Sequence, residues 1–397
     1  MLMHKGTPAK PIVSVGEHVN LGQKIGEAEA EDAVPVHASV SGEVAGVTEY
    51  VSLTGEKSLC VAIVPDGKQT RDPNLKPPEQ ISSRESFLRA VKESGCVGLG
   101  GSGKPTHIKL GTQKKIDLLI VNGAECEPYL TADCRQMVED PAEVLGGMQM
   151  IMQMLGIKEG RIGISDDKPA AVKIFSDTCR SIPEITVCSL HTGYPQGAEK
   201  VLIYHVSGRL VPEYAQPDDI GVIVLNVRTV AFLYRYFRTG MPLVEAVVTV
   251  DGDAVRNPAN LRVPVGTPMK NLLSYCGCNF DKLGQLISGG VMMGVDVPDK
   301  DMPVIKQQNG LLAFRRERTW EPSACIHCGR CMRACPMKLM PMELERAYQK
   351  FNAKKLIKLH ASLCTGCGCC SYVCPAKRPL AVELQYAKKM LEEGGTL

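Results

Sequence analysis

The 397-residue sequence lacks the features that mark secreted, membrane-spanning and nucleic-acid-binding chains. No apolar run approaches the ~20 residues needed to cross a bilayer, so any membrane association must come through partner proteins. The first residues contain no apolar core of the kind found in signal peptides. The net charge is only +3, and no basic run is interleaved with aromatic residues, which argues against nucleic acid as a partner. No nucleophile–base pair stands out, so we expect cofactors to carry any chemistry.

Cysteine, by contrast, is abundant, with 17 residues, and two runs near the C-terminus share one spacing. Both runs read C-x2-C-x2-C-x3-C-P, the spacing of bacterial ferredoxins that hold two [4Fe–4S] clusters. A zinc ribbon needs only four ligands, and the two runs supply twice as many. The expected ligands are Cys325, Cys328, Cys331, Cys335, Cys364, Cys367, Cys370 and Cys374. The sequence therefore predicts two iron–sulfur cubanes, and Cys369 is not expected to be a ligand.

The spacing also predicts which thiolates share a cluster, because in such ferredoxins the fourth cysteine of each run binds the cluster of the other run. Cluster one is expected to use Cys325, Cys328, Cys331 and Cys374. Cluster two is expected to use Cys364, Cys367, Cys370 and Cys335. Thiolates held in clusters, without a signal peptide, indicate a reducing cytoplasm rather than a disulfide-forming compartment.

The chain length predicts several domains, and the pattern indicates a multidomain α/β and α+β fold. Residues 1–65 read as short strands between glycine turns and resemble the barrel-sandwich fold of lipoyl domains, without their modifiable lysine, so a structural or docking role is expected. Residues 66–240 begin with a proline-rich linker and then alternate strands and helices, as in a Rossmann-like domain. Residues 241–298 suggest a small mixed sheet. Residues 296–318 are expected to form a connector, and residues 299–397 to make up the part that holds a ferredoxin-like helical domain.

Within the α/β part, hydrophobic patterns predict individual elements. A helix is expected over residues 82–94, capped by Ser82 or Ser83. The methionine-rich segment 141–155 is expected to be a core helix. The apolar segment 221–226 is typical of a central parallel strand. Other elements expected in this part are strands at 116–122, 161–165 and 185–190, and helices at 169–176 and 230–238. Later in the chain, helices are expected at 269–275 and 380–393.

A second candidate site combines a glycine-rich loop, residues 98–103, with polar residues that follow a strand. The loop matches neither the Rossmann nor the Walker pattern, but a nest of backbone N–H groups there can hold a phosphate beside Lys104 and Lys109. Asn122, Glu125 and Glu127 lie at the carboxyl end of the expected strand, where open α/β sheets bind ligands. These residues alone fit a phosphorylated cofactor or a packing turn with a solvated charged rim equally well.

Several motifs occur in one order that resembles a known family over nearly the whole chain. They are 98–109 (GLGGSGKPTHIK), 122–129 (NGAECEPY), 194–200 (YPQGAEK), 226–229 (NVRT), 287–294 (ISGGVMMG) and the two cysteine runs. This order resembles RnfC, a component of the Rnf-type ion-translocating ferredoxin:NAD oxidoreductase. The central part is also similar to the NADH-binding flavoprotein subunit of respiratory complex I. Residues 243–295 are then expected to form a β-grasp module of the SLBB type.

The resemblance implies that residues 98–229 bind FMN. The residues it implies for the phosphate and ribityl group are Gly98, Gly100, Gly101, Gly103 and Lys109, with Asn226 and Thr229 near the phosphate. Those implied for the isoalloxazine and nicotinamide side are Asn122, Glu125 and Glu127, with Tyr194, Gly197 and Glu199 along the pocket. One departure is Lys104, where the family commonly has a phenylalanine that stacks on the nicotinamide. A lysine offers a charge to a pyrophosphate instead, so flavin binding is better supported than NADH binding.

By the same resemblance, the protein exchanges hydride between NAD(H) and FMN and passes single electrons through two clusters. Its implied partners are membrane subunits of the complex and ferredoxin, and its implied location is the inner face of the cell membrane. Two alternatives stay open: a soluble flavin and iron–sulfur reductase of the same superfamily, and a cluster relay that has lost flavin or NADH binding.

Four further residues can be interpreted either as functional or as having only a structural or surface role. Arg330 and Arg333 flank the first cysteine run and either raise the potential of its cluster or dock an acidic ferredoxin, or are solvated surface cations. His107 is either a cofactor contact or a satisfied loop histidine. Cys126 lies between two glutamates that should raise its pKa, so we expect it to pack rather than react.

Overall fold

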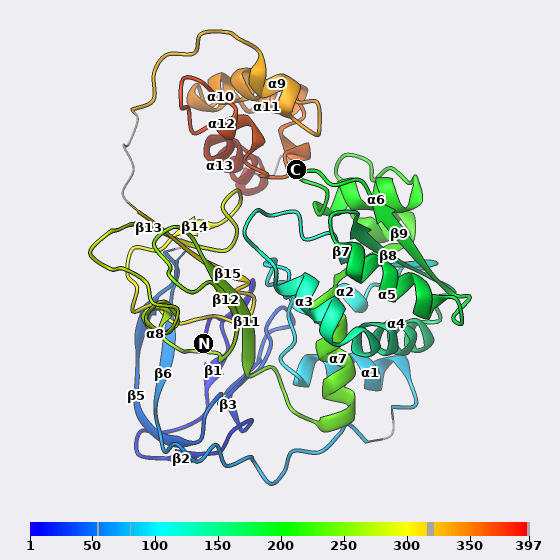
Figure 1. The fold of residues 1–397 in the computed structure, drawn as a ribbon, viewed down its shortest axis with the longest axis vertical. Helices are drawn as coiled ribbons and strands as arrows, with labels where there is room; N and C mark the ends of the chain where they lie inside the picture. The colour runs from blue at the N-terminus through cyan, green and yellow to red at the C-terminus, as the bar shows by residue number, and fades with distance from the viewer. Residues whose placement is uncertain (54, 80, 316–320, 395–397) are drawn as a thin grey trace.

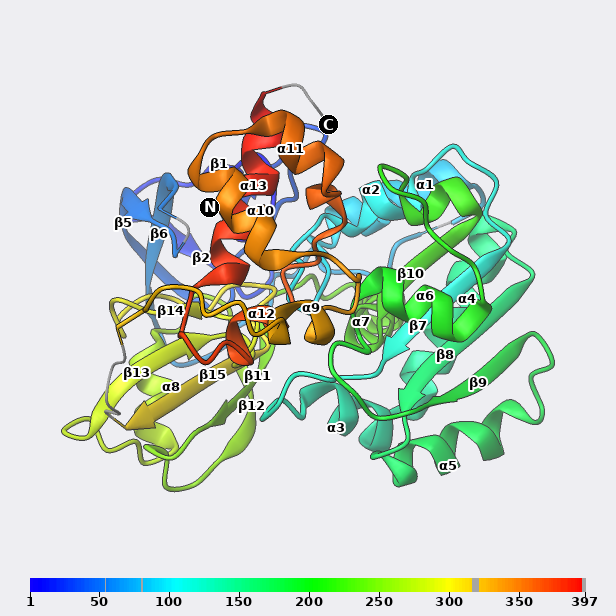
Figure 2. The same ribbon diagram turned by 90° about the horizontal axis from the view of Figure 1, so that it is seen from above.

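A computed structural model describes residues 1–53, 55–79, 81–315 and 321–394 as four parts, each with its own hydrophobic core (Figure 1). We name them the N-terminal β module (residues 1–65), the α/β unit (66–240), the mixed-sheet unit (241–315) and the helical unit (321–394). Seen from above, the helical unit lies across the α/β unit and the mixed-sheet unit (Figure 2). In these described ranges, no helix is both long enough and apolar enough to span a bilayer.

The N-terminal β module consists of two three-stranded antiparallel sheets, with strand orders β1-β3-β4 and β2-β5-β6. Its strands are β1 (Lys10–Pro11), β2 (His18–Val19), β3 (Lys24–Glu27), β4 (Val36–His37), β5 (Gly42–Val51) and β6 (Lys57–Pro65). Val19, Val36 and Val44 are buried between them. The expectation of short strands forming a sandwich is confirmed.

The α/β unit is built on a parallel sheet with the order β10-β7-β8-β9. The strands are β7 (Leu118–Gly123), β8 (Glu159–Ser165), β9 (Ile185–Leu190) and β10 (Val222–Asn226). The helices are α1 (Arg84–Glu93), α2 (Thr106–Leu110), α3 (Ala132–Glu139), α4 (Pro141–Leu155), α5 (Pro169–Cys179), α6 (Glu199–Ser207), the 3₁₀ turn η1 (Pro217–Ile220) and α7 (Val227–Thr239).

Alternate residues of β7 face opposite layers, as the period of a strand requires. Leu119 and Val121 pack in the core that includes α1, α4, α5 and α7, whereas Leu118 and Ile120 pack with α6. Ser83 caps α1 by accepting a hydrogen bond from the Ser86 amide, as predicted. The methionine-rich helix α4 is also confirmed as a core helix, because its buried methionines lie in the larger core.

Strand β10 corrects one prediction, since it lies at an edge of this sheet and not at its centre. Its apolar run has another cause: Ile223 and Leu225 face the core shared with α7, while Val222 and Val224 face α6. A strand covered on both faces is apolar wherever it lies in the sheet. Helix α7 also begins at Val227, earlier than expected, so Thr229 lies in its first turn.

The mixed-sheet unit is a five-stranded sheet with the order β12-β11-β15-β13-β14. Its elements are β11 (Glu245–Asp251), β12 (Ala259–Pro264), α8 (Met269–Tyr275), β13 (Leu283–Ser288), β14 (Val295–Asp296) and β15 (Gly310–Arg315). β15 pairs in parallel with β11 and antiparallel with β13, so it is the middle strand. The prediction of a connector over residues 296–318 is therefore wrong for Gly310–Arg315, and residues 316–318 lie outside the described ranges. The domain boundary expected at residue 298 would cut this sheet.

A buried lysine joins three of the parts. Lys306 precedes β15 and is fully buried, and its Nζ donates hydrogen bonds to the carbonyl oxygens of Pro35, at 2.8 Å, and Gly95, at 2.9 Å. Burial lowers the pKa of Lys306 to about 7. The N-terminal β module is thereby fastened next to the glycine-rich loop.

The helical unit is a cluster of short helices closed by one longer helix, as predicted. Its elements are α9 (Arg330–Ala334), α10 (Pro341–Gln349), α11 (Ala353–Lys358), the 3₁₀ turn η2 (Ala361–Leu363), α12 (Cys369–Tyr372) and α13 (Leu380–Glu393). Leu344, Leu356 and Leu384 are buried between α10, α11 and α13. α9 and α12 follow the two cysteine loops and contact each other.

Candidate cofactor sites

Two asparagines stand side by side at the carboxyl edge of the parallel sheet, because Asn122 of β7 pairs in register with Asn226 of β10. Asn122 donates from Nδ2 to the Gly197 carbonyl at 2.9 Å, which brings the segment before α6 to this edge. Asn226 caps α7 by accepting a hydrogen bond from the Arg228 amide at 2.9 Å. The structure thus brings Asn122, Asn226 and Gly197, expected around the flavin, to one place.

The glycine-rich loop closes on itself and rests on this edge. The Gly103 amide donates to the Gly98 carbonyl at 3.1 Å. A Cβ on Gly100 would lie 2.9 Å from Nδ2 of Asn226, so only glycine permits this approach. Gly101 and Gly103 have φ values of +98° and +63°, which favour glycine. The amides of Gly98, Leu99 and Gly103 already donate within the protein, so among the described residues those of Gly100 and Gly101 are the glycine amides left for a phosphate.

Thr229 holds this loop from beneath. Its hydroxyl accepts a hydrogen bond from the Leu99 amide at 2.9 Å, and the residue is fully buried. The resemblance implied that Thr229 lies near the phosphate. The structure places it next to the loop, with its hydroxyl on the loop backbone.

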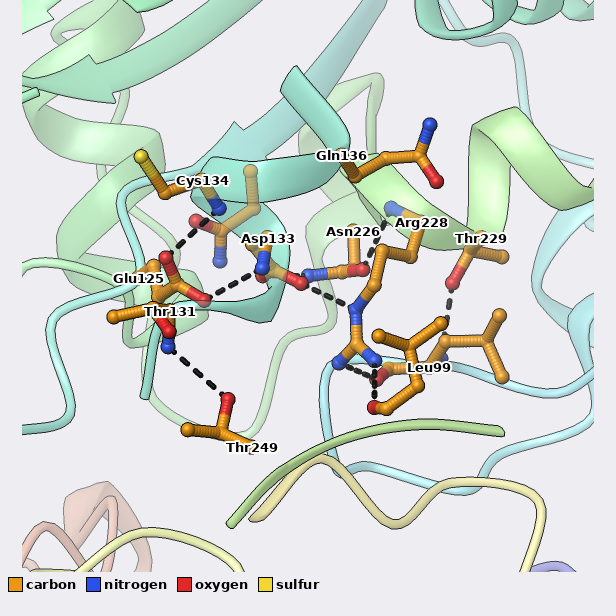
Figure 3. A network of polar contacts seen from close by, with 12 residues as sticks. Leu99, Glu125, Thr131, Asp133, Cys134, Gln136, Asn226, Arg228, Thr229 and Thr249 are labelled. Atoms are coloured by element: carbon orange, nitrogen blue, oxygen red, sulfur yellow. Dashed lines mark hydrogen bonds and ion pairs between the residues drawn. The ribbon is translucent and has the colours of Figure 1, made fainter. Parts of the chain in front are cut away.

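A buried ion pair that the sequence analysis did not predict lies next to Asn226, whose side-chain amide donates to Asp133 (Figure 3). Arg228 donates from Nε to the Asp133 carboxylate at 2.5 Å, and its side chain is only 6% exposed. Its other nitrogens donate to the carbonyls of Leu99 and Val247, each at 2.7 Å. Arg228 therefore ties α3, the glycine-rich loop and β11 together. The sequence could have identified Arg228 as a site residue, because it lies inside the motif at 226–229. No motif in the sequence identifies Asp133 as one.

Glu125 points into the same network. Its two carboxylate oxygens accept hydrogen bonds from the backbone amides of Asp133, at 2.6 Å, and Cys134, at 2.9 Å, which are in the first turn of α3. Burial, and then the nearby Asp133 carboxylate, raises the pKa of Glu125 to about 7. A carboxyl group of this kind can hold or release a proton near neutral pH.

Glu127 and Tyr194 lie where three parts of the protein meet. Glu127 accepts a hydrogen bond from the Met292 amide of the mixed-sheet unit at 3.0 Å. The Tyr194 hydroxyl lies 3.5 Å from Glu127 and donates to the carbonyl oxygen of Cys367, in the helical unit, at 2.7 Å. Burial raises the pKa values of both side chains, so the phenol stays neutral. The pocket residue expected at 194 therefore also contacts a predicted cluster ligand.

Cations line the outer side of the glycine-rich loop. Lys109 forms an ion pair with Glu199 at the start of α6. Lys104 is exposed, and over the described ranges no carboxylate forms an ion pair with it. Partial desolvation lowers the pKa of Lys104, while Glu199 acts in the opposite direction. A free ammonium beside an open backbone loop fits the phosphate of a nucleotide or flavin.

Two neighbouring residues have structural roles. His107 contacts the Glu31 carbonyl through Nε2 at 2.9 Å, while its Nδ1 is buried without a hydrogen-bond partner among the described residues, so only one of its two ring nitrogens is satisfied. The Cys126 sulfur accepts a hydrogen bond from the Gly197 amide at 3.2 Å. Burial raises the pKa of Cys126, so the prediction of an unreactive thiol is confirmed, although burial matters more than the glutamates.

The second cysteine run surrounds a cavity, and the fourth cysteine of the first run lines the same cavity. Its walls include Cys335, Cys364, Cys367 and Cys370. Cys369 lines it as well. This grouping fits the exchange of fourth ligands expected for cluster two. In the part of the chain that the structure describes, no three Cys, His, Asp or Glu side chains are arranged to hold a single metal ion.

The first cysteine run is more open. Cys328 is exposed, and Cys374, the fourth ligand expected for cluster one, lines a surface groove with Arg330, Arg333 and Lys377. Neither arginine forms an ion pair with a carboxylate of the described residues. The groove therefore combines a predicted cluster ligand with unneutralised positive charge.

Family models match nearly the whole chain in four segments. They are the RnfC barrel sandwich hybrid domain at residues 1–68, the Nuo51 FMN-binding domain at 91–235, the SLBB domain at 247–296 and a 4Fe-4S dicluster domain at 324–377. The expected fold class and the expected cofactors, FMN and two [4Fe–4S] clusters, are confirmed at this level. The barrel-sandwich and flavin assignments thus agree with the sheets described above.

Solved structures show the same fold at low identity. The NAD⁺-reducing [NiFe]-hydrogenase in its H₂-reduced state aligns with a TM-score of 0.54 and 14% identity, covering 78% of this chain and 61% of that chain. Its air-oxidised state aligns with a TM-score of 0.52 and 17% identity, covering 78% and 54%. These likenesses concern the fold alone.

Curated relatives are much more similar, and all three described here are RnfC proteins of ion-translocating complexes. The one from the Na⁺-translocating ferredoxin:NAD⁺ oxidoreductase complex of Acetobacterium woodii is 41% identical, covering 98% of this chain and 89% of that protein. Its counterpart in the proton-translocating complex of Clostridium ljungdahlii is 38% identical, covering 87% and 77%. The one from the ion-translocating oxidoreductase complex of Rhodobacter capsulatus is 37% identical, covering 98% and 77%. The chain therefore belongs to the RnfC family of the ion-translocating ferredoxin:NAD⁺ oxidoreductase complexes.

Proposed function

We propose that the carboxyl edge of the parallel sheet binds FMN and a nicotinamide nucleotide, and that the helical unit connects this site electrically to a membrane-bound complex. When bound, FMN supplies the conversion between two-electron hydride exchange with NAD(H) and single-electron transfer to iron–sulfur clusters. The observation that carries the proposal is one contact: Tyr194, beside the strand-end residue Glu127, touches the backbone of the predicted cluster ligand Cys367.

The residues of the sheet edge would bind and orient the cofactor. Among the loop glycines, Gly100 and Gly101 would offer backbone amides to the phosphate, while Gly98 and Gly103 would close the loop through their own amides, with Lys109 and Asn226 nearby. Asn122, Glu125 and Glu127 would line the ring side, and Glu199 would hold Lys109. Glu125 can keep a proton on its carboxylate near pH 7, because burial opposes its ionisation. Lys104 would pair with a phosphate of the nicotinamide nucleotide.

The eight cysteines of the two runs would hold the clusters, with Cys335 and Cys374 exchanged between them. The partners we propose are the membrane subunits of the complex and ferredoxin, which would keep the protein at the inner face of the cell membrane. The groove beside Cys374 supports an acidic electron carrier, because Arg330, Arg333 and Lys377 line it and no carboxylate among the described residues does. We also propose domain boundaries near residues 65, 240 and 315.

Anaerobic titration of the purified protein with NADH and NADPH, followed by absorption, tests the proposal. We expect flavin bands that bleach with a pyridine nucleotide, followed by loss of cluster absorbance. Cluster absorbance without flavin bands would indicate a relay protein, and flavin that no pyridine nucleotide bleaches would contradict hydride exchange. Lys104→Met is the informative variant, because it removes the charge and keeps an unbranched side chain without adding an aromatic ring that could stack on the nicotinamide. It should weaken pyridine nucleotide binding roughly tenfold if the ammonium pairs with a phosphate.

A further inference from the structure

The two cysteine runs differ in how they meet the α/β unit, although their spacing is identical. The α/β unit forms polar contacts with the second cysteine run and with the turn that precedes it, at residues 360–362. Glu213 contacts Nδ1 of His360 at 2.5 Å and also accepts a hydrogen bond from Ser362, while Tyr194 contacts Cys367. Within the described ranges, residues 321–335, which carry the first run, form no hydrogen bond or ion pair with residues 1–315.

The contact at Cys367 is supported from the mixed-sheet unit. The Met292 amide donates to Glu127, and the Met292 carbonyl lies so close to Gly368 that a Cβ there would be 2.6 Å away. Gly290 faces Glu127 at an equally short distance, since its Cβ would lie 2.4 Å from the carboxyl group. The loop at 290–292 therefore packs closely against both Glu127 and the second cysteine loop, at Gly368.

We propose that Tyr194 is a positioning residue that holds the second cysteine loop against the flavin site and tunes the potential of its cluster. Cluster two then exchanges electrons with the flavin first, and cluster one exchanges them with the partner protein. This order rests on the function proposed above. Each step moves one electron, so one group is oxidised as the next is reduced, and no bond is made or broken.

The expected tuning follows from the direction of the hydrogen bond. A hydroxyl that donates to the carbonyl of a ligand residue draws electron density away from that peptide group, which would favour the more negative, reduced state of the cluster that the residue would hold. Removing that hydroxyl should therefore shift the potential of cluster two to more negative values. Cluster one, with no such contact, should keep its potential.

The test compares the full-length protein, with its cofactors, as the Tyr194→Phe variant and as the matched control Tyr204→Phe. Tyr204 lies half exposed on α6, in the same unit, with its ring next to the ring of His205. Dithionite titration monitored by electron paramagnetic resonance should show one cluster shifted negatively in Tyr194→Phe and none in the control. A Cys328→Ser variant identifies the cluster one signal by altering its spectrum.

Rapid mixing with NADH gives the second readout. The rate of cluster reduction relative to flavin reduction should fall roughly tenfold in Tyr194→Phe, as the loss of one buried hydrogen bond allows. If the potential of cluster one moves instead, or if both readouts equal those of Tyr204→Phe, the inference is wrong. If Tyr194→Phe fails to assemble its clusters, Glu213→Gln loosens the same loop without touching a ligand and should lower only the rate ratio.

The two proposals can fail separately. If NADH does not reduce the flavin of the wild-type protein, the proposed function is wrong. The dithionite titration does not need NADH, so it still measures the effect of the Tyr194 hydroxyl on the potential of cluster two. Normal NADH reduction with unchanged cluster potentials and rates contradicts only the role of Tyr194.

Discussion

The α/β unit and the helical unit position their cofactor groups by different means. In the α/β unit a parallel sheet is packed on both faces, and the polar residues at its edge are bonded to one another, as Asn226, Asp133 and Arg228 are. In the helical unit α9 and α12 are very short, and the predicted ligands surround a cavity. The first unit can therefore form its site by packing alone, whereas the second should depend on metal–thiolate bonds.

The largest expected effect comes from removing one exchanged ligand. Cys335→Ser should lower the iron content from about eight to about four per chain, because cluster two loses a ligand while cluster one keeps all of its own. Hydrogen exchange should rise in α10 and α13 but not in α4 and α7 of the α/β unit. Iron analysis and exchange mass spectrometry measure both effects.

Cys369→Ser is the matched control, since Cys369 lines the same cavity and is not an expected ligand. It should keep its full iron content. If Cys335→Ser instead abolished the spectrum of cluster one, or if exchange rose equally in α4, the contrast between the two units would not hold.

A second variant tests the α/β unit. Arg228→Met leaves the Asp133 carboxylate buried without its cation, which should cost about 3–5 kcal/mol of unfolding free energy. Arg135→Met removes an exposed ion pair with Glu139 on the neighbouring helix α3 and should cost less than about 1 kcal/mol. Denaturant unfolding followed by flavin release measures both. If both variants lost the same unfolding free energy, the buried pair of Arg228 and Asp133 would not stabilise the α/β unit more than an exposed pair does.

The smallest effect is a pH dependence. The pKa of Glu125 is raised from 4.5 to about 7 in the folded protein, so the folded state keeps a proton that the unfolded state has lost between these values. The unfolding free energy should therefore fall as the pH rises from 4.5 to about 7, by at most about 3 kcal/mol. Asp133 and Arg228 are the charged neighbours of this carboxyl group.

In Glu125→Gln this pH-dependent fall should disappear, because the amide does not titrate. Urea unfolding at several pH values between 5 and 8 gives the comparison. An identical slope in the wild type and the variant would assign the pH dependence to another group.

Much of this organisation could be predicted from the sequence, because it depends on local patterns. The spacing of the cysteine runs predicts ligands whose grouping around one cavity the structure supports. Alternating apolar segments predict the strands and helices of the α/β unit. The position of Asn122 at the end of a strand predicts a ligand-binding edge, since the carboxyl ends of parallel strands meet there.

The errors and omissions concern contacts between distant segments. β10 was expected at the centre of its sheet because burial on two faces looks the same in sequence at any position in the sheet. β15 was missed because a six-residue strand does not reveal that it pairs with β11, far earlier in the chain. Asp133 and the contact between Tyr194 and Cys367 have no local signal. The first depends on how α3 packs beside α7 within the α/β unit, and the second on how two separate units dock.

The middle position of β15 limits how this architecture can be taken apart or recombined. Gene fusions exchange modules most readily where the chain crosses between them only once, at a surface. Here the last strand before the helical unit is flanked on both sides by earlier ones, so a protein truncated before Gly310 would expose the open edges of β11 and β13 and invite aggregation. An engineered version without iron should therefore end after Arg315.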